Sequence, residues 1–181
     1  HLVTGVGMPA VYRSFLESDI AGPLISIGIA GAYRDTNLQI GDVVLVGSEV
    51  VGDLGVELPE GPGFCPLRDF PFGASHVKVD LHAPVVGCVP VVNGCTVSTV
   101  TGTCATGILR RDMFGASIET MEGYAVADIA NARGVRCIEV RAISNFAAER
   151  DMQPTNVRLA LEALSTFWMQ HGMDILEAVC S

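Results

Sequence analysis

Basic residues, long apolar runs and paired cysteines are all scarce in this chain, and each shortage excludes a class of protein. Lys and Arg number 11 against 20 Asp and Glu, the net charge is −9, and no basic stripe is present. Binding to a nucleic-acid backbone is therefore not expected. No apolar run reaches the ~18 residues of a membrane-spanning helix. The first residues also lack the basic and apolar stretches of a signal peptide.

The six cysteines form no Cys-x-x-Cys pair and match no zinc or disulfide spacing. They predict unpaired, buried or neutral thiols in a reducing cytoplasm. His76 and His82 lie close together in a loop-like stretch, where two solvated side chains are more common than a metal pair. We therefore expect no metal site and no cofactor.

Apolar residues, by contrast, make up 49% of the 181 residues, and charged residues only 17%. A chain of this length can form a substantial core, and an excess of apolar residues is typical of a subunit contact. We expect a single domain over residues 1–181 that assembles as a homo-oligomer. The chain begins at His1, without Met, on what resembles the end of a strand. The domain is therefore expected to lack its N-terminal strand.

Apolar, β-branched runs alternate with segments of helical spacing. The predicted strands lie at 2–3, 24–27, 43–46 with a continuation at 49–51, 85–92, 95–100 and 135–143. The predicted helices lie at 9–18, 106–113, 121–133 before Gly134, and from a cap at Thr155 or Asn156 to about 179. Residues 56–84, rich in Gly, Pro and Phe, are predicted to form a long functional loop. Strands that are almost wholly apolar predict a three-layer α/β/α fold with a mixed, mainly parallel central sheet.

Four short segments carry unusual residues where predicted strands end, which is the place where such sheets bind ligands. They are Gly5-Val6-Gly7, Gly28-Ile29-Ala30-Gly31, Met121-Glu122-Gly123 and Ser144-Asn145. Taken singly, a glycine-rich segment is most often a tight turn, and a Glu after Met is most often an acid at a helix N-terminus. An Asn after a strand is most often a turn residue. The order of these segments along the chain is more specific than any one of them.

In that order the chain resembles the purine nucleoside phosphorylase and methylthioadenosine nucleosidase family. The matching segments are Gly28-Ile29-Ala30-Gly31, Gly41-Asp42-Val43-Val44, Glu119-Thr120-Met121-Glu122-Gly123 and Arg141-Ala142-Ile143-Ser144-Asn145. The resemblance implies the fold of this family, a purine nucleoside as the small-molecule partner, and cleavage of the bond between base and ribose. Segments similar to the futalosine hydrolase branch of the family are Gly5-Val6-Gly7-Met8, Asp53-Leu54-Gly55 and Thr99-Val100-Thr101-Gly102-Thr103.

The resemblance also implies a role for individual residues. Glu122 would accept hydrogen bonds from the ribose 2′- and 3′-hydroxyls and stabilise the positive charge that develops on the sugar. Met121 would pack against the ribose, and Ser144 and Asn145 would face the base. Further substrate contacts are implied for Ala30, Gly31, Thr103 and Cys104.

Asn145 predicts the type of base. An aspartate there can protonate N7 of adenine and accept from its 6-amino group, whereas an asparagine offers an acceptor to an N7 proton and a donor to O6. The amide therefore suits a 6-oxopurine such as hypoxanthine. A hydrogen bond at N7 relieves the negative charge that the departing base gathers. Asn145 and Glu122 are accordingly the predicted catalytic residues.

Two positions favour water over phosphate as the attacking group. The bacterial hexameric phosphorylases of this family hold phosphate with an Arg before the glycine-rich segment and a Ser within it; here those positions are Ser26 and Ile29. Only Arg34 lies nearby, and an apolar side chain cannot donate to a phosphate oxygen. We therefore expect an N-ribohydrolase. The resemblance to the futalosine hydrolase branch implies that it releases hypoxanthine and dehypoxanthinylfutalosine in menaquinone biosynthesis. Arg34 and Arg150 are candidates for binding the benzoate-type tail of futalosine, although solvated surface arginines are the more common case.

Three alternatives stay open. The chain could be a methylthioadenosine/S-adenosylhomocysteine nucleosidase or a purine nucleoside phosphorylase. It could also be an inactive nucleoside-binding protein, because the water-activating Glu of the family lies upstream of the Thr4-Gly5-Val6-Gly7 turn and this chain has no such segment. A dinucleotide-binding domain is the third alternative, and Pro9 in its glycine-rich turn and the downstream motifs disfavour it.

Overall fold

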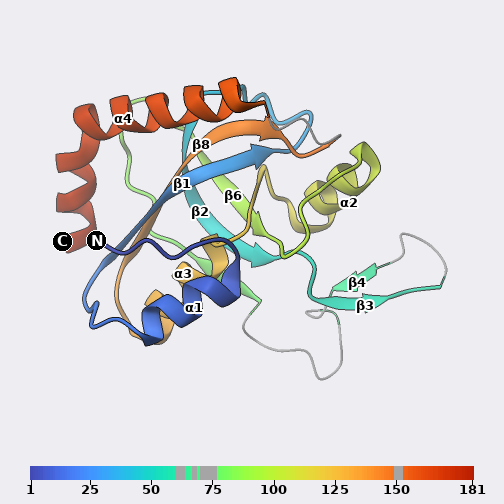
Figure 1. The fold of residues 1–181 in the computed structure, drawn as a ribbon, viewed down its shortest axis with the longest axis horizontal. Coiled ribbons are helices and arrows are strands. Elements are labelled where there is room, and N and C mark those ends of the chain that lie inside the picture. Colours follow the sequence, from blue (N-terminus) through green and yellow to red (C-terminus); the bar gives the residue numbers. More distant parts are fainter. Residues whose placement is uncertain (60–63, 67–68, 70–76, 149–152) are drawn as a thin grey trace.

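The fold is that of a computed structural model, which describes residues 1–59, 64–66, 69, 77–148 and 153–181 (Figure 1). Helices and strands alternate along much of the chain. In chain order they are α1 (Met8–Leu16), β1 (Leu24–Ala32), β2 (Val43–Val51), β3 (Gly55–Glu57), β4 (Phe64–Pro66), β5 (Lys78–Asp80), β6 (Val91–Thr96), α2 (Cys104–Phe114), β7 (Ile118–Thr120), α3 (Gly123–Ala132), β8 (Cys137–Phe146) and α4 (Pro154–Cys180).

The main sheet closes on itself. Its strands are hydrogen-bonded in the order β5-β2-β6-β7-β1-β8, and β2 pairs with β8 as well as with β6. The pairs β1–β8, β2–β6 and β6–β7 are parallel, whereas β1–β7, β2–β5 and β2–β8 are antiparallel. The prediction of a mixed α/β sheet is confirmed. The three-layer and mainly parallel arrangement is not confirmed, because β2 pairs antiparallel with β8 and so closes the ring of strands β2-β6-β7-β1-β8, with β5 beside β2.

Helices cover this sheet through apolar contacts. In α4, Leu164, Phe167 and Ile175 pack on Ile138 and Val140 of β8, and all five side chains are buried. The buried positions of α4 recur at helical spacing, which is why its amphipathic pattern predicted the helix. Figure 1 shows α4 over β8 and β1, while α1 and α3 lie together elsewhere on the sheet, where they form a second apolar cluster. No helix within the described residues is long and apolar enough to cross a membrane.

Strand β6 replaces the two strands predicted at 85–92 and 95–100, so both of those bounds are wrong. The first segment is interrupted because Gly87 turns the chain with a φ of 52°. The second stops early because the backbone N–H groups of Ser98–Thr99 donate to Asp53 Oδ2, at 2.6 and 2.9 Å. The Asp53 carboxylate thus accepts from backbone N–H groups that would otherwise pair with a neighbouring strand.

Three other predictions of secondary structure are corrected. Residues 2–3 form no strand, because they pair with no other strand among the described residues. The segment 56–84 is not wholly a loop, since β4, β5 and most of β3 fall in it, with β3 and β4 apart from the main sheet (Figure 1). Strand β7 was missed because three residues are too few to show a period.

Helix ends follow the capping signals in part. Gly134 adopts a φ of 63° directly after α3, as its position predicted. The predicted caps of the last helix, Thr155 and Asn156, are wrong, since α4 begins at Pro154 with Gln153 as its N-cap. The proline ring fixes φ near the helical value and lacks the N–H that would need a partner, so the helix starts there.

The cysteines are unpaired, as predicted. Cys95 and Cys137 are buried, and burial raises the pKa of each thiol to about 12. Cys88, Cys104 and Cys180 are exposed. The reducing compartment inferred from these residues stays a prediction.

Candidate active site

A cavity of about 300 Å³ lies where the carboxyl-terminal parts of β1 and β8 meet β7. This volume is in the range of small-molecule sites. Six of the predicted site residues line it: Ala30, Gly31, Met121, Glu122, Ser144 and Asn145. The other lining residues are Val6, Ile29, Val100, Thr101, Glu119 and Thr120. The two predicted catalytic side chains, which come from segments far apart in the sequence, therefore share one cavity.

Thr103 and Cys104 are not among the residues that line this cavity. Thr103 is the N-cap of α2, and its Oγ1 accepts from the Thr106 N–H at 3.2 Å. Cys104, the first residue of α2, is exposed. A contact of either residue with substrate stays a prediction.

The glycine-rich segment 28–31 continues β1 and does not end it, so its prediction as a turn is wrong. The Arg141 guanidinium lies across Gly28, in the space that a Cβ there would fill. A Cβ at Gly31 would lie 3.0 Å from Asn145 Nδ2, within the range where neighbouring atoms must shift. These two glycines allow side chains of β8 to lie close to the backbone of β1.

The Asn145 amide has a defined orientation. Ser144 Oγ donates to Asn145 Oδ1 at 2.9 Å, and Asn145 Nδ2 donates to the Phe146 carbonyl at 3.3 Å. Ser144 is buried, whereas Asn145 is partly exposed to the cavity. The amide keeps one acceptor and one donor position for a ligand.

Glu122 lies at the start of α3, where it is the N-cap residue. Its Oε1 accepts from the Gly7 N–H at 2.7 Å, so the carboxylate also holds the turn that precedes α1. The backbone N–H groups at a helix start favour a negative charge there. The hydrogen bond from the Gly7 N–H therefore holds the carboxylate at the cavity.

A group of buried polar side chains supports the start of α3, and we call it the core cluster: Glu49, Thr96, Thr120, Glu139 and Arg141. Arg141 Nε donates to Glu139 Oε1 at 2.7 Å, and Thr96 Oγ1 donates to Glu49 Oε2 at 2.8 Å. Burial, together with the nearby Glu139 charge, raises the pKa of Glu49 well above its usual range.

The core cluster reaches α3 through two hydroxyls. The Gly123 N–H donates to Thr120 Oγ1 at 3.2 Å, and the Tyr124 N–H donates to Thr96 Oγ1 at 2.8 Å. These bonds satisfy N–H groups of the first helical turn. The position of Glu122, one residue before Gly123, thus depends on the buried cluster.

A second polar group, which we call the pocket cluster, consists of Tyr33, Thr101, Arg110 and Glu119. Glu119 Oε2 accepts from Tyr33 Oη at 3.0 Å and pairs with Arg110 Nη1 at 3.0 Å. Sequence reasoning included Glu119 in a family motif but gave it no role. The available signal in the sequence is a glutamate next to the apolar Ile118.

Arg34, one of the two predicted cation sites, is not among the residues that line the cavity. The Arg34 guanidinium is exposed and lies over the Phe146 ring, 4.5 Å from its centroid. Arg150 and His76 lie outside the described residues, and His82 is exposed. In the part of the chain that the structure describes, no three His, Cys, Asp or Glu side chains group as metal ligands would.

Comparison with known proteins assigns the chain to a family. Residues 3–174 match the family described as Phosphorylase superfamily. The chain belongs to this family. It is 36% identical over 150 residues to a futalosine hydrolase of Streptomyces coelicolor, an alignment that covers 78% of this chain and 61% of the relative. It is 30% identical over 174 residues to a futalosine hydrolase of Thermus thermophilus, covering 91% of this chain and 77% of the relative.

The chain thus spans 61% of the Streptomyces relative. Solved structures share its fold. The native futalosine hydrolase of Helicobacter pylori has a TM-score of 0.69 at 17% identity, covering 92% of this chain and 77% of that chain. A 5′-methylthioadenosine/S-adenosyl homocysteine nucleosidase of Campylobacter jejuni has a TM-score of 0.68 at 23% identity, covering 93% and 79%. The resemblance first noted in the motifs is confirmed by these relatives.

Proposed function

We propose that this chain hydrolyses the N-glycosidic bond of a 6-oxopurine nucleoside, with futalosine as the substrate. The observation that carries the proposal is that Asn145 and Glu122 line one cavity at the ends of β8 and β7. Relatives with the name futalosine hydrolase, at 30% and 36% identity, support the choice of substrate. The products would be hypoxanthine and dehypoxanthinylfutalosine.

Asn145 would activate the leaving base. Ser144 donates to Asn145 Oδ1 at 2.9 Å, which orients the amide so that Oδ1 can also accept from N7–H and Nδ2 can donate to O6. The electron pair of the bond between C1′ and N9 passes to the purine as that bond breaks. Proton uptake at N7 from solvent relieves the negative charge that results, and Oδ1 stabilises the N7-protonated base by accepting from the new N7–H. Water adds to C1′ and gives up a proton to solvent, which replaces the proton taken up at N7.

Glu122 would bind the ribose. Its Oε1 accepts from the Gly7 N–H, and the remaining lone pairs of the carboxylate are available to the ribose hydroxyls. As the bond to the base lengthens, positive charge develops on the sugar, and the nearby carboxylate stabilises it. Met121, beside it in the lining, would pack its thioether on the sugar.

Water is the attacking group that this cavity favours. Ile29 presents an apolar side chain to the lining, and no Arg, Lys or His among the described residues lines the cavity. Arg141 lies in an adjoining cavity, but it pairs with Glu139 and donates to Ser26 Oγ at 2.9 Å. Its charge is therefore already balanced, so the described residues that line these two cavities offer phosphate no free cation.

The direct test is chromatographic detection of hypoxanthine after incubation with futalosine or inosine, with and without phosphate. We expect release from futalosine in phosphate-free buffer. Strict dependence on phosphate would indicate a phosphorylase instead. Preferred release of adenine from methylthioadenosine would indicate the other nucleosidase, and binding without release would indicate a nucleoside-binding protein.

Asn145→Asp is expected to shift preference toward 6-aminopurine nucleosides. A carboxylate no longer donates to O6, so the ratio of kcat/KM values for 6-oxo and 6-amino substrates should fall by about tenfold or more. Asn93→Asp is the matched control, because Asn93 is an exposed amide that donates to the Gly115 carbonyl. Equal base selectivity in the two variants would contradict the role of Asn145.

Glu122→Gln is expected to lower kcat by about 10²–10³, because the amide keeps an acceptor for Gly7 but loses the negative charge beside the sugar. The thermal midpoint should change little. Glu17→Gln, an exposed change at the end of α1, serves as the control. Near wild-type turnover of the Glu122 variant would remove Glu122 from the site.

The same proposal includes a homo-oligomer. Large apolar side chains are exposed at Leu16, Val85 and Met169. Such side chains are often covered by a second subunit. Light scattering should give a mass above the 19.1 kDa of one chain; a single-chain mass at micromolar concentration would contradict it.

A further inference from the structure

Glu119 lies on the side of the cavity where the base is proposed to bind. Gly31 of β1 pairs with Glu119 of β7 on one edge and with Asn145 of β8 on the other. Neighbouring strands lie about 4.8 Å apart, so Glu119 and Asn145 flank Gly31 at the end of the same three strands. Both residues line the cavity.

The Glu119 carboxylate is almost wholly engaged. Its Oε1 accepts from the Thr101 N–H at 2.8 Å, and its Oε2 accepts from the Thr101 hydroxyl and from Tyr33 Oη at 3.0 Å. Arg110 Nη1 also donates to Oε2 at 3.0 Å. The Glu119 side chain is 6% exposed and that of Arg110 is 12% exposed. A carboxylate held by so many donors is fixed in place.

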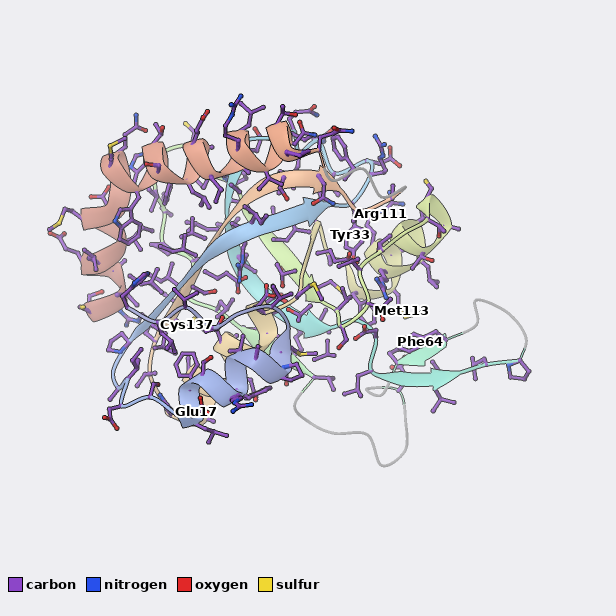
Figure 2. The ribbon with its side chains drawn as sticks, in the orientation of Figure 1. Glu17, Tyr33, Phe64, Arg111, Met113 and Cys137 are labelled. Carbon is purple, nitrogen blue, oxygen red and sulfur yellow. The ribbon has the colours of Figure 1, made fainter. Side chains whose placement is uncertain are left out.

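The pocket cluster fixes the conformation of residues 99–101. Arg110 Nη1 donates to the Thr99 carbonyl and to Thr101 Oγ1, each at 2.9 Å. Val100, between them, lines the cavity together with Thr101. Figure 2 shows Tyr33 just beyond the end of β1, on the side of α2, the helix that carries Arg110. The residue after β1, the segment 99–101 and helix α2 thus all donate to the Glu119 carboxylate. That carboxylate holds the wall of the cavity formed by Val100 and Thr101.

The charge of this wall matters for the proposed reaction. The departing purine gathers negative charge, and an unbalanced carboxylate beside it would raise the energy of the transition state. Arg110 balances Glu119 with a guanidinium that is itself nearly buried. Burial raises the pKa of Tyr33 above its usual range, so the phenol stays a neutral donor.

We propose that the Arg110–Glu119 ion pair, held by Tyr33, positions the wall formed by Val100 and Thr101 and keeps it electrically neutral beside the departing base. Arg110, Glu119 and Tyr33 are positioning residues in this scheme. The inference rests on the proposed function, since it assigns the base to this side of the cavity.

Positioning is tested by two tyrosine variants. Tyr33→Phe removes a hydroxyl that donates to Glu119, and Tyr12→Phe removes one that donates to Asp128 at 2.8 Å, outside this cavity. We expect Tyr33→Phe to raise the KM for futalosine and the Kd for hypoxanthine about three- to tenfold, with kcat within about twofold. Tyr12→Phe should leave all three constants unchanged. Equal values in the two variants would overturn the positioning role.

Neutrality is tested by removing the charges one at a time and together. Arg110→Met leaves the carboxylate without its counter-charge and should lower kcat about tenfold or more. Adding Glu119→Gln should recover most of that loss, because the wall is neutral again. A double variant as slow as Arg110→Met, or slower, would overturn the proposal. Arg110→Lys keeps the charge but not the forked geometry, so it should raise KM and spare kcat.

Calorimetric binding of hypoxanthine separates this inference from the proposed function. If the wild-type chain binds hypoxanthine without hydrolysing any nucleoside, the proposed function fails, while a weaker Kd in Tyr33→Phe still supports the wall. If the wild type hydrolyses futalosine and the Tyr33 and Arg110 variants have the same constants as the wild type, the positioning proposal is wrong and the proposed function stands. Absence of both binding and hydrolysis in the wild type overturns both.

Discussion

The pocket cluster contains one carboxylate and one guanidinium, whereas the core cluster contains two carboxylates and one guanidinium. In the pocket cluster, Arg110 faces Glu119, and the hydroxyls of Tyr33 and Thr101 complete the hydrogen bonds. In the core cluster, Arg141 faces Glu139, and the second carboxylate, Glu49, is fully buried without a cation of its own.

The two carboxylates of the core cluster affect each other's ionisation. Burial and the nearby Glu139 charge raise the pKa of Glu49, and its oxygens accept from the Thr96 and Thr120 hydroxyls. Glu139 Oε2 has no hydrogen-bond partner among the described residues. The core cluster thus supports α3 although its carboxylates outnumber its guanidinium, whereas the wall proposed to lie beside a departing anion would have no such freedom.

The largest expected effect comes from Arg141→Met, which removes the guanidinium that faces the two buried carboxylates. The free energy of unfolding should fall by about 3–5 kcal/mol, the usual loss when one partner of a buried ion pair is removed. Urea denaturation measures it, with Arg158→Met at the exposed pair with Glu162 as the control. A loss no greater than in that surface variant would show that the core cluster does not need its cation.

A smaller loss is expected from Gly123→Ala. The added Cβ would meet oxygens of both Glu49 and Glu139, which approach the backbone closely at the start of α3. Overpacking of this kind should reduce the free energy of unfolding by about 1–3 kcal/mol. Gly102→Ala is the matched control, because nothing lies within 4 Å of a Cβ there. Similar urea midpoints for both variants would mean that the two carboxylates can move aside.

The smallest effect per pH unit, and the most specific one, is the pH dependence of Glu49→Gln. In the folded wild type Glu49 binds its proton more tightly than in the unfolded chain, so stability falls as pH rises above the ordinary pKa of 4.5. One such group changes the free energy of unfolding by at most about 1.4 kcal/mol per pH unit. The amide has no proton to lose, so the free energy of unfolding of the variant should increase relative to that of the wild type as pH rises from 5 to 8. Measurements spaced about one pH unit apart cover this range.

Urea denaturation at several pH values gives that difference directly. Glu162→Gln, on the exposed face of α4, controls for the loss of a surface charge. A constant difference between Glu49→Gln and wild type over this pH range would show that Glu49 is not the protonated member of the core cluster.

The residue types and their order along the chain were sufficient to predict those candidate site residues that depend only on their sequence neighbours. Glu122 lies at a helix start and Asn145 near a strand end, and both positions were predicted from the neighbouring residues. Their convergence on one cavity followed from the rule that ligands bind beyond the carboxyl ends of strands. Two further predictions needed only the residue types: the amide of Asn145 predicts a 6-oxopurine base, and the apolar side chain of Ile29 predicts water as the attacking group.

Tertiary structure decided the closure of the sheet and both buried clusters. Tyr33 and Glu119 are 86 residues apart, and Ser26 and Arg141 are 115 residues apart, so their contacts depend on strand register. A glutamate in a strand has the same sequence signature whether it faces water or a buried guanidinium. Only the pairing of β1 with both β7 and β8 sets which charges meet, because a shift of one residue would turn each side chain to the opposite face.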